Sequence, residues 1–540
     1  MKIQRRNHAA VLIPSAEDDR DVRGAIAAGH PLTAAAGARI LAEGGNAADA
    51  CVAAAFASWV AESPLTGPGA GGFALVVPAD RRPARVADFF VATPGLGLPR
   101  PRGAQMHAID VGFGGDSETT QVFRIGEASC AVPGTALGLE AVHQAYGSLP
   151  WSELVRPAIE LAREGVELSR AQAHLHAILD LILRHAPEGQ RVYSRPDGSR
   201  LVPGDTLLLP DLAATLERIA ADGVQSLYQG DLAEQIVETV QRGGGELTAR
   251  DLAQYGVVWR RPVRAAYRGH EVISNPPPSS GGVLIAYGLA LLERLPGGGT
   301  GTFEAVQSLV SVMREQTRTR ADGFSAALYR GGLAQRLLAE ENLSEALARM
   351  RADGRAEHTP AGGTTHISAV DVEGNAVSLS SSTGSGSGVI VPGTGIHLNN
   401  MLGEYDLAAP GPPTPGRRLT SMMAPTVVVG ENGPRLVVGS AGSVRLRGAI
   451  MQVIENVVGH SLDVAAAIDA PRVHVEEQFV HCEGGFDEHE LDRLEAAGYE
   501  LVRWRRRNLF FGGTNAVEVH GDGTLSAAGD PRRGGGGDVV

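Results

Sequence analysis

Lysine is almost absent from this 540-residue chain: Lys2 is the only one, although arginine is abundant. This scarcity excludes mechanisms that need a buried lysine, either as a Schiff-base former or as the lysine of a P-loop. Cysteine is also scarce. Cys51, Cys130 and Cys482 lie far apart in the sequence, which is typical neither of a disulfide framework nor of a zinc site. We therefore expect chemistry without a metal or a cofactor.

Long hydrophobic runs are missing as well. The most apolar segment, Ala50 to Ala61, is bounded by Asp49 and Glu62 and is too short to span a bilayer. The N-terminal residues are basic but contain no apolar stretch long enough for a signal peptide. The net charge of −13 argues against nucleic acid or an anionic membrane surface as a partner. These features predict a soluble, cytoplasmic protein.

The chain is long enough for a large core, and helical and strand patterns follow one another along it. Helices dominate before residue 363, and strands become frequent after residue 364. The expected strands are 72–77, 85–91, a pair near 257–274, 364–371, 376–382, a hairpin at 424–440 and a pair near 508–528. The expected helices lie around 31–45, 47–61, 133–184, 209–243, 280–295, 303–350, 446–458 and 487–497. This order favours a layered α/β architecture over separate α and β domains.

Two segments have little core character. Residues 351–363, RADGRAEHTPAGG, are polar and predict an exposed linker. The C-terminal RRGGGGDVV is the one low-complexity run of the sequence.

Several familiar motifs are absent or stand in the wrong context. GPGAGG at 67–72 fits G-x-G-x-x-G, but an expected helix precedes it and an expected strand follows, the reverse of a dinucleotide site. We therefore expect tight backbone packing there. Among the hypotheses for the function, an oxidoreductase is a distant third. No G-x-S-x-G elbow is present. His174, His176 and His185 lie close in sequence without H-E-x-x-H, which does not indicate a metal site.

The stretch GGTTHISAVDVEGNAVSLSSS, residues 362–382, places two glycines before two threonines at the start of an expected strand. A threonine hydroxyl is a weak nucleophile that needs a base. If the bond between Gly363 and Thr364 is cut, the new α-amino group, with a pKa of roughly 7.7–8.0, can be that base. The glycines have no Cβ to obstruct attack of the Thr364 hydroxyl on the Gly363 carbonyl. On these residues alone, a β-hairpin with a flexible lead-in is the simpler alternative.

Such a site also needs backbone N–H groups that stabilise an oxyanion. The segment VVGSAGSVRLRGAI, 437–450, predicts a turn from a strand into a helix, with Gly442 and Ser443 at or near the helix start. Simple capping of the helix is the competing explanation for this turn.

A longer series of motifs resembles the γ-glutamyltranspeptidase family of N-terminal nucleophile hydrolases over nearly the whole chain. The motifs, in family-like order, are HPLTAAAGARILAEGGNAADACVAAAFA, SPLTGPGAGGFALVV, CAVPGTALGLEAVHQAYGSLPWSELVRPAIELAREGV, NPPPSSGG, TTHISAVDVEGNAVSLSSS, GIHLNNMLGE, LTSMMAPTVVV and GDPRRGG. The resemblance implies a four-layer αββα sandwich. It also implies self-cleavage between Gly363 and Thr364, which would give a large-subunit segment, 1–363, and a small-subunit segment, 364–540.

The resemblance also implies catalytic roles for individual residues. Thr364 matches the family's nucleophile. Ser382 falls where the family has a second hydroxyl residue that hydrogen-bonds the nucleophile. Gly442 and Ser443 match the glycine pair of the oxyanion hole.

The substrate-binding half of the resemblance is less complete. Thr420 and Ser421 match a serine pair that binds the substrate carboxylate, Glu404 matches an acidic residue that binds the α-amine, and Asn400 belongs to the same NNMLGE motif. The family's transpeptidases carry an arginine where this chain has Phe90, which cannot form a bidentate pair with a carboxylate. Gly384 stands near an expected asparagine, and Met401 replaces a polar residue. Losing such a charged contact costs about 2–5 kcal/mol when the opposite charge stays buried and unpaired.

The leading hypothesis is therefore an autoprocessing amidohydrolase or acyltransferase of the γ-glutamyltransferase type. Its Thr364 would form an acyl-enzyme from a small amide, γ-glutamyl or related, that water or an amine resolves. An acylase or amidase of the same family with a non-glutamyl substrate is one alternative, and an unprocessed scaffold is another. The expected partners are the small-molecule amide and the chain's own two segments, and a homo-oligomer is left open.

Overall fold

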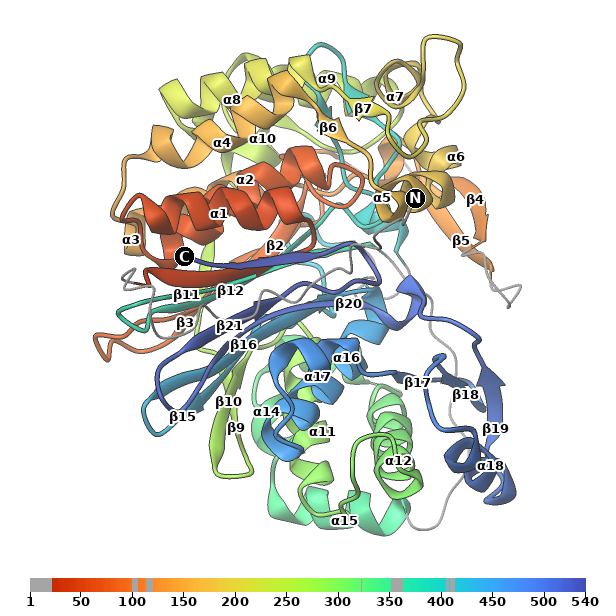
Figure 1. Cartoon of the computed structure of the whole chain (residues 1–540). Helices are drawn as coiled ribbons and strands as arrows, with labels where there is room; N and C mark the ends of the chain where they lie inside the picture. The colour runs from red at the N-terminus through yellow and green to blue at the C-terminus, as the bar shows by residue number, and fades with distance from the viewer. Residues whose placement is uncertain are drawn as a thin grey trace, which may run out of the picture.

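Two β-sheets lie face to face in the middle of the molecule, and a helical layer covers the outer face of each sheet (Figure 1). The computed structural model describes residues 22–99, 105–112, 120–321, 323–350, 363–404, 407 and 413–540. The two central sheets between two helical layers confirm the expected four-layer αββα sandwich of the α/β class.

The first sheet has seven strands in the order β22-β1-β11-β12-β2-β3-β8, and every pairing is antiparallel. Its strands are β1 (Gly24–Ala28), β2 (Gly71–Val77), β3 (Arg85–Phe89), β8 (Val258–Arg260), β11 (Thr365–Asp371), β12 (Ala376–Ser382) and β22 (Gly536–Val539). Because β11 has neighbours on both sides, Thr364 just before it lies in the interior of the molecule.

The second sheet has six antiparallel strands in the order β21-β20-β16-β15-β10-β9. They are β9 (Val263–Tyr267), β10 (His270–Ser274), β15 (Thr426–Gly430), β16 (Gly433–Ala441), β20 (Gly513–Val519) and β21 (Leu525–Ala528). Buried apolar side chains from both sheets, including Phe73 of β2 and Val437 of β16, form one cluster between them. Burial of this apolar surface holds the two sheets together.

The first helical layer packs on the outer face of the first sheet (Figure 1). Its helices are α1 (Pro31–Ala42), α2 (Ala47–Ala61), α3 (Thr135–Tyr146), α4 (Trp151–Glu164), α5 (Arg170–Ile178), α6 (Asp180–Leu183), α7 (Pro187–Tyr193), α8 (Pro210–Asp222), α9 (Asp231–Arg242) and α10 (Ala249–Ala253).

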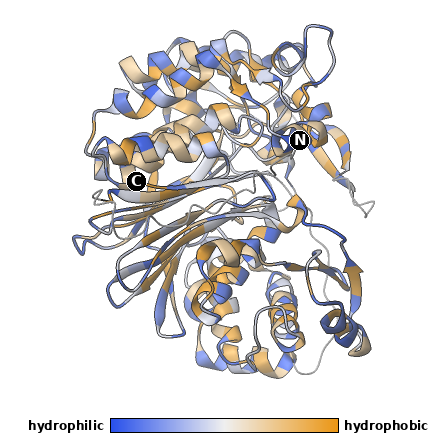
Figure 2. Cartoon of the chain, viewed as in Figure 1, coloured by the Kyte–Doolittle hydropathy of each residue, from blue (hydrophilic) through white to orange (hydrophobic). Residues whose placement is uncertain are grey.

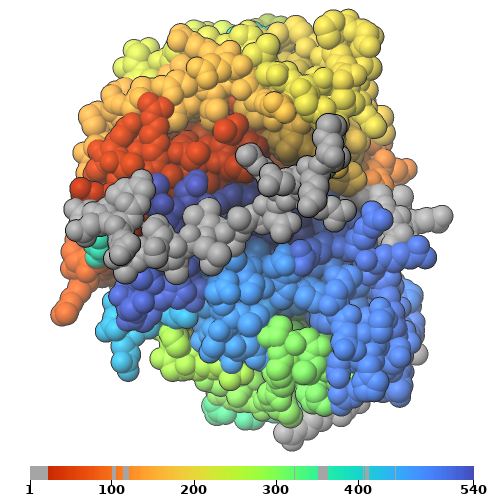
Figure 3. All heavy atoms as spheres, viewed as in Figure 1, coloured from red at the N-terminus to blue at the C-terminus, as the bar shows by residue number. Residues whose placement is uncertain are grey.

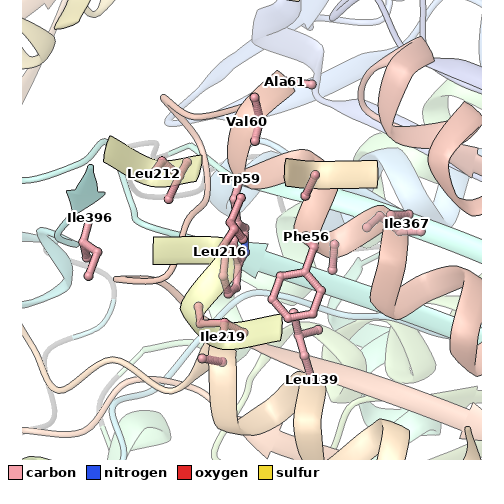
Figure 4. Packing of buried hydrophobic residues seen from close by; sticks show 14 of the residues in the cluster. Phe56, Trp59, Val60, Ala61, Leu139, Leu212, Leu216, Ile219, Ile367 and Ile396 are labelled. Atoms are coloured by element: carbon pink, nitrogen blue, oxygen red, sulfur yellow. The ribbon is translucent and has the colours of Figure 1, made fainter. Parts of the chain in front are cut away.

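Helix α2 is the centre of this layer's core. The Asn46 side chain caps its first turn, and all 15 of its residues are buried, in keeping with its nearly all-apolar sequence. The centroid of the Phe56 ring lies 4.7 Å from that of Trp59 (Figure 4). It lies 5.3 Å from the ring centroid of Trp151. Truncating such a side chain costs about 3–5 kcal/mol. This rigid helix ends next to Glu62, which the candidate site uses.

The second helical layer covers the outer face of the second sheet. Its helices are α11 (Gly281–Leu292), α12 (Phe303–Thr319), α13 (Phe324–Arg330), α14 (Leu333–Leu337), α15 (Glu340–Met350), α16 (Leu446–Ile454) and α17 (Val464–Asp469). A small sheet of β17 (Val473–Glu476), β18 (Phe479–Cys482) and β19 (Glu500–Arg503) with α18 (Glu488–Ala496) lies beside them. Figure 2 shows hydrophobic residues along both helical layers and the sheets.

Three short strand pairs lie outside the layers. They are β4 (His107–Gly112) with β5 (Thr120–Ile125), β6 (Val166–Glu167) with β7 (Thr206–Leu207), and β13 (Ile390–Val391) with β14 (Ile396–His397). Over the described ranges, no helix combines the length and the apolar character that crossing a membrane requires.

The C-terminal run RRGGGGDVV is not merely a low-complexity tail. It contains β22, which pairs with β1 from Ala25↔Val539 to Ala28↔Gly536. Its glycines allow close approach, because a Cβ on Gly537 would lie 2.7 Å from the backbone carbon of Ala527. The expected linker is a separate case, since its residues 351–362 lie outside the described residues.

Residues before and after position 364 interleave in both sheets. In the first sheet β1 lies between β22 and β11, and β12 lies beside β2. In the second, β10 lies beside β15. In the face shown in Figure 3, early residues (red to yellow) cover one end and late residues (blue) with a green segment cover the other. The sheets therefore join the two parts of the chain into one body.

Candidate active site

Thr364 lies at the entrance of β11, with only 5% of its surface exposed. The strand that follows is fixed on both sides, because Thr365 pairs with Ser381 of β12 and Ile367 pairs with Ala28 of β1. This double pairing holds Thr364 at the end of a rigid strand rather than on a loop.

Ser382, at the end of β12, contacts the residue before Thr364. Its hydroxyl donates a hydrogen bond to the carbonyl oxygen of Gly363, and its Oγ accepts one from the backbone N–H of Gly384 at 2.8 Å. The Gly384 N–H thus orients the hydroxyl towards the carbonyl. In the continuous chain Ser382 is placed to polarise the bond between Gly363 and Thr364.

Asn400 and Glu404 lie together beside this serine. The Asn400 amide donates to the Ser385 hydroxyl at 2.7 Å and to Glu404 Oε1 at 3.3 Å. A Cβ on Gly384 would lie 2.1 Å from Asn400 Oδ1 and 3.2 Å from Glu404 Oε1. Gly384, at φ +74°, therefore gives both side chains room.

Thr420 and Ser421 are buried in the segment that precedes β15. The Ser421 hydroxyl oxygen accepts a hydrogen bond from the backbone N–H of Met423 at 3.0 Å. The Ser421 carbonyl accepts one from the backbone N–H of Ser280 at 2.7 Å and one from the Ser279 hydroxyl at 3.0 Å. These contacts anchor Ser421 to the start of α11.

Gly442 and Ser443 form the turn between β16 and α16. Gly442 has φ +122° and Ser443 has φ +53°, so two successive residues lie at positive φ. Such turns point backbone N–H groups to one side and bind negative oxygens. The side chain of Ser443 makes this conformation more strained than a glycine would.

Phe90 lies in a packed apolar environment. Its ring stacks on Phe73 at 5.4 Å, it is 1% exposed, and it shares a buried cluster with Met401, Leu419 and Met423. Two departures from the resemblance, Phe90 and Met401, therefore belong to the same buried cluster. Apolar side chains fill the position where a carboxylate clamp was expected.

A pocket opens beside Thr364, and we call it the Thr364 pocket. Its polar lining includes Glu62, Gln172 and Arg533, and its apolar lining includes Leu65, Leu175 and Leu509. No pattern in the sequence selects these residues. The only available signals were an acidic residue directly after an all-apolar helix and the arginine pair of GDPRRGG, to which no role was given.

Glu62 is the buried acid of this pocket. Its carboxylate accepts a hydrogen bond from the Thr33 hydroxyl at 2.9 Å and another from the Thr365 hydroxyl. A Cβ on Gly29 would lie 2.2 Å from Glu62 Oε2, so a glycine is required there. Burial raises the pKa of Glu62 from 4.5 to about 7, although both hydroxyls and the charge of Arg533 act to lower it. This carboxyl therefore has a pKa near neutral pH.

The histidines of the pocket are neutral. Burial lowers the pKa of His176 to about 4 and that of His366 to about 3, and it also lowers the pKa of His30. His366 instead lies between Ser380 and Ser368, at 2.8 and 2.9 Å. In the described ranges no group of three potential metal ligands comes together.

Comparison with known proteins places this geometry in context. The family model described as gamma-glutamyltranspeptidase matches residues 33–540. The acylase ACY 1 proenzyme of Pseudomonas sp. (strain V22) is 33% identical over 522 residues, which cover 94% of this chain and 91% of that protein. The glutathione hydrolase proenzyme of Escherichia coli (strain K12) is 31% identical over 546 residues, 95% of this chain and 91% of that one.

A solved structure agrees with these sequence matches. The cephalosporin acylase of Bacillus halodurans superposes with a TM-score of 0.80 at 25% identity, covering 99% of both chains. The match therefore includes both sheets and both helical layers. The chain belongs to the gamma-glutamyltranspeptidase family and has its N-terminal nucleophile hydrolase fold.

Proposed function

We propose that this chain is an autoprocessing amidohydrolase or acyltransferase whose nucleophile is Thr364. Cleavage between Gly363 and Thr364 would divide it into a large segment, 1–363, and a small segment, 364–540. The observation that carries the proposal is the hydrogen bond from the Ser382 hydroxyl to the Gly363 carbonyl, next to a buried Thr364 in a chain of this family.

Cleavage follows from this contact in two balanced steps. The Thr364 hydroxyl attacks the Gly363 carbonyl carbon, its proton passes to the departing nitrogen, and an ester replaces the peptide bond. Ser382 stabilises the negative charge that develops on the Gly363 oxygen. The first step thus frees the α-amino group of Thr364. Water then hydrolyses the ester, which leaves a carboxylate on Gly363 and restores the Thr364 hydroxyl.

In the cleaved enzyme the α-amino group of Thr364 removes the proton from its own hydroxyl. The hydroxyl oxygen attacks the carbonyl of an amide substrate, and the N–H groups of Gly442 and Ser443 stabilise the oxyanion. The amine departs with a proton and leaves an acyl-enzyme on Thr364. Water resolves it to an acid, or another amine resolves it to a new amide. His176 and His366 have pKa values far below neutral, so they are weak bases. This is consistent with a base supplied by Thr364 itself.

The acyl group is the second question. Asn400, Glu404, Thr420 and Ser421 remain the proposed substrate-binding residues, and a γ-glutamyl amide is one candidate donor. The buried cluster of Phe90 and Met401 favours an acyl group that places no carboxylate at that position. An acylase acting on a non-glutamyl amide is therefore the second candidate, and the acylase names of two close relatives support it.

The intact mass of the purified protein under denaturing conditions tests the cleavage. We expect two chains that separate at 363/364, a single chain for Thr364→Ala, and normal cleavage for Thr524→Ala, which changes an exposed threonine. Hydrolysis of γ-glutamyl and simple acyl anilides by the cleaved protein then identifies the acyl group. A wild-type chain that stays whole after long incubation would contradict the proposal.

A further inference from the structure

Arg533 is a buried cation in the Thr364 pocket, and no side-chain ion pair of its guanidinium occurs among the described residues. Its side chain lines the pocket together with Thr364 and Glu62. Its Nε is buried, and no hydrogen-bond acceptor for it exists among the residues that the structure describes. Burial lowers the pKa of Arg533 to about 10, so the group is still charged at neutral pH.

The nearby acids are already hydrogen-bonded to other groups. Asp530 pairs with Arg472 at 2.7 Å and accepts the backbone N–H of Thr514 at 2.8 Å, while its other oxygen accepts the backbone N–H of Arg532 at 2.9 Å. Both oxygens of Glu62 bind threonine hydroxyls. These acids therefore act on Arg533 only at longer range, and the cost of burying its charge is not offset by a direct ion pair.

The guanidinium lies beside the proposed oxyanion turn. A Cβ on Gly442 would lie 3.7 Å from Arg533 Nη2, and one on Gly513 would lie 2.3 Å from Arg533 Cδ. Gly513 thus leaves room for the aliphatic part of the Arg533 side chain, and the guanidinium lies beside the turn at Gly442. A group bound to this cation would be next to the reacting carbonyl.

The strand order shows on which side of Thr364 this cation lies. Two of the proposed acyl-binding residues, Asn400 and Glu404, lie on the β12 side of β11, because they contact Gly384, which comes directly after the end of β12. The part of the pocket that contains Arg533 lies on the other side, because Gly29 follows β1 and Arg533 precedes β22. An amide bound with its acyl part towards β12 therefore has its amine part towards the pocket.

We propose that the Thr364 pocket is an amine-side subsite in which Arg533 binds a carboxylate carried by the leaving amine or by an acceptor amine. Leu65, Leu175 and Leu509 provide an apolar wall for the carbon skeleton between the nitrogen and that carboxylate. A guanidinium binds a carboxylate through two parallel N–H···O bonds, which fixes its orientation. This subsite rests on the proposed role of Thr364 as nucleophile.

Equilibrium binding tests the subsite without turnover. The probes are 5-amino-2-nitrobenzoate and 4-nitroaniline, which differ only in the carboxylate, and the protein is the Thr364→Ala chain. We expect the benzoate to bind roughly tenfold to hundredfold more tightly, as is typical of a hydrogen bond to a charged group. Arg533→Met in the same background should abolish that preference. Arg242→Met, which changes an exposed arginine of α9, should keep it. Equal binding of the two probes to the parent chain would overturn the proposal.

Kinetics on the cleaved enzyme give the second test. The substrates are a 4-nitroanilide and a 3-carboxy-4-nitroanilide of one acyl group, and the quantity is the ratio of their kcat/KM values. Arg533→Met should lower that ratio roughly tenfold to hundredfold, and Arg533→Lys should retain part of it. An equal loss on both substrates would assign Arg533 to the oxyanion and overturn the subsite.

The two tests separate the possible failures. If Arg533→Met does not fold, the wild-type ratio and Arg533→Lys decide, and a wild-type ratio near one overturns the proposal. If no anilide is hydrolysed, the proposed function fails, while the binding experiment still accepts or rejects the subsite.

Discussion

The two sides of Thr364 offer a substrate opposite environments. On the β12 side, Phe90 and Met401 belong to a buried apolar cluster. On the β1 side, the Thr364 pocket holds the Glu62 carboxyl and the Arg533 guanidinium. Thr364, the proposed nucleophile, lies between them at the start of β11. With Thr364 as the nucleophile, a charged group of the substrate could be bound on either side of the bond that is cleaved.

The largest expected effect is that of a change at Ser382, whose hydroxyl donates a hydrogen bond to the Gly363 carbonyl. Ser382→Ala should slow cleavage at 363/364 by about a hundredfold or more, because it removes a donor from the developing oxyanion. The fraction of cleaved chain against time, measured by denaturing mass spectrometry, gives the rate. Ser382→Thr should restore most of it, and Ser308→Ala in α12 should have no effect. Wild-type cleavage by Ser382→Ala would contradict the role given to this hydroxyl.

Phe90→Arg would place a cation on the apolar side. We expect it to lower the free energy of unfolding by about 3–5 kcal/mol, because the charge would be buried without a partner. Phe90→Leu, which stays apolar, should cost less than about 1.5 kcal/mol. Denaturant unfolding of the two variants measures the difference. A stable Phe90→Arg enzyme that gains hydrolysis of a γ-glutamyl anilide would show instead that this side is an open carboxylate site.

Glu62 makes the other side sensitive to pH. The folded state holds this proton more tightly than the unfolded chain, with a pKa of about 7 against 4.5. Its favourable contribution is therefore complete below pH 4.5 and is lost as the pH rises through 7. Glu62→Gln should lack this part of the decline, which amounts to about 1–3 kcal/mol between pH 5 and 8.

Unfolding midpoints measured across that pH range test the prediction. Glu164→Gln, an exposed change in α4, should retain the wild-type decline. Identical pH profiles for the wild type and Glu62→Gln would show that Glu62 does not retain its proton in the folded state.

The smallest expected effect is at the oxyanion turn. Ser443→Gly should raise the free energy of unfolding by about 0.5–1 kcal/mol, because glycine adopts a positive φ without the Cβ clash. Ser461 has a similar φ, +57°, and Ser461→Gly is the matched control with a similar gain in stability. Only the change at Ser443 should alter kcat. A changed kcat in both variants, or in neither, would argue against a special role for the 442–443 turn.

The sequence predicted the local structure well where a single pattern decides it. The expected strand 376–382 is β12, and the expected strand 364–371 differs from β11 by one residue. The buried helix before Glu62 was also predicted, because its residues are apolar all around. The short strand β1 was not predicted, since its five residues show no alternation: both faces of the strand are buried.

The candidate site was predicted only in part, for a physical reason. The residues from Gly363 to Ser382 lie on adjacent strands, and the hydroxyl chemistry of Thr364 made them recognisable. Glu62 and Arg533 lie near opposite ends of the sequence and meet only because β1, α2 and β22 pack around β11. No local pattern encodes that meeting. That Phe90 and Met401 belong to one buried cluster was not predictable for the same reason, although each is a departure from the resemblance.

The interleaving of the strands also sets the order of events in the life of the molecule. Neither piece of a chain cut at 363/364 could complete a sheet alone, because β1 would lack β11 and β22, and β12 would lack β2. The bond between Gly363 and Thr364, at which we propose cleavage, reaches its place beside Ser382 only after these strands have paired. The cut then removes the covalent route back to that starting state. Maturation by this route would act as a ratchet: the intact chain is the folding template, and the finished enzyme, once unfolded, should not reassemble from its separated halves.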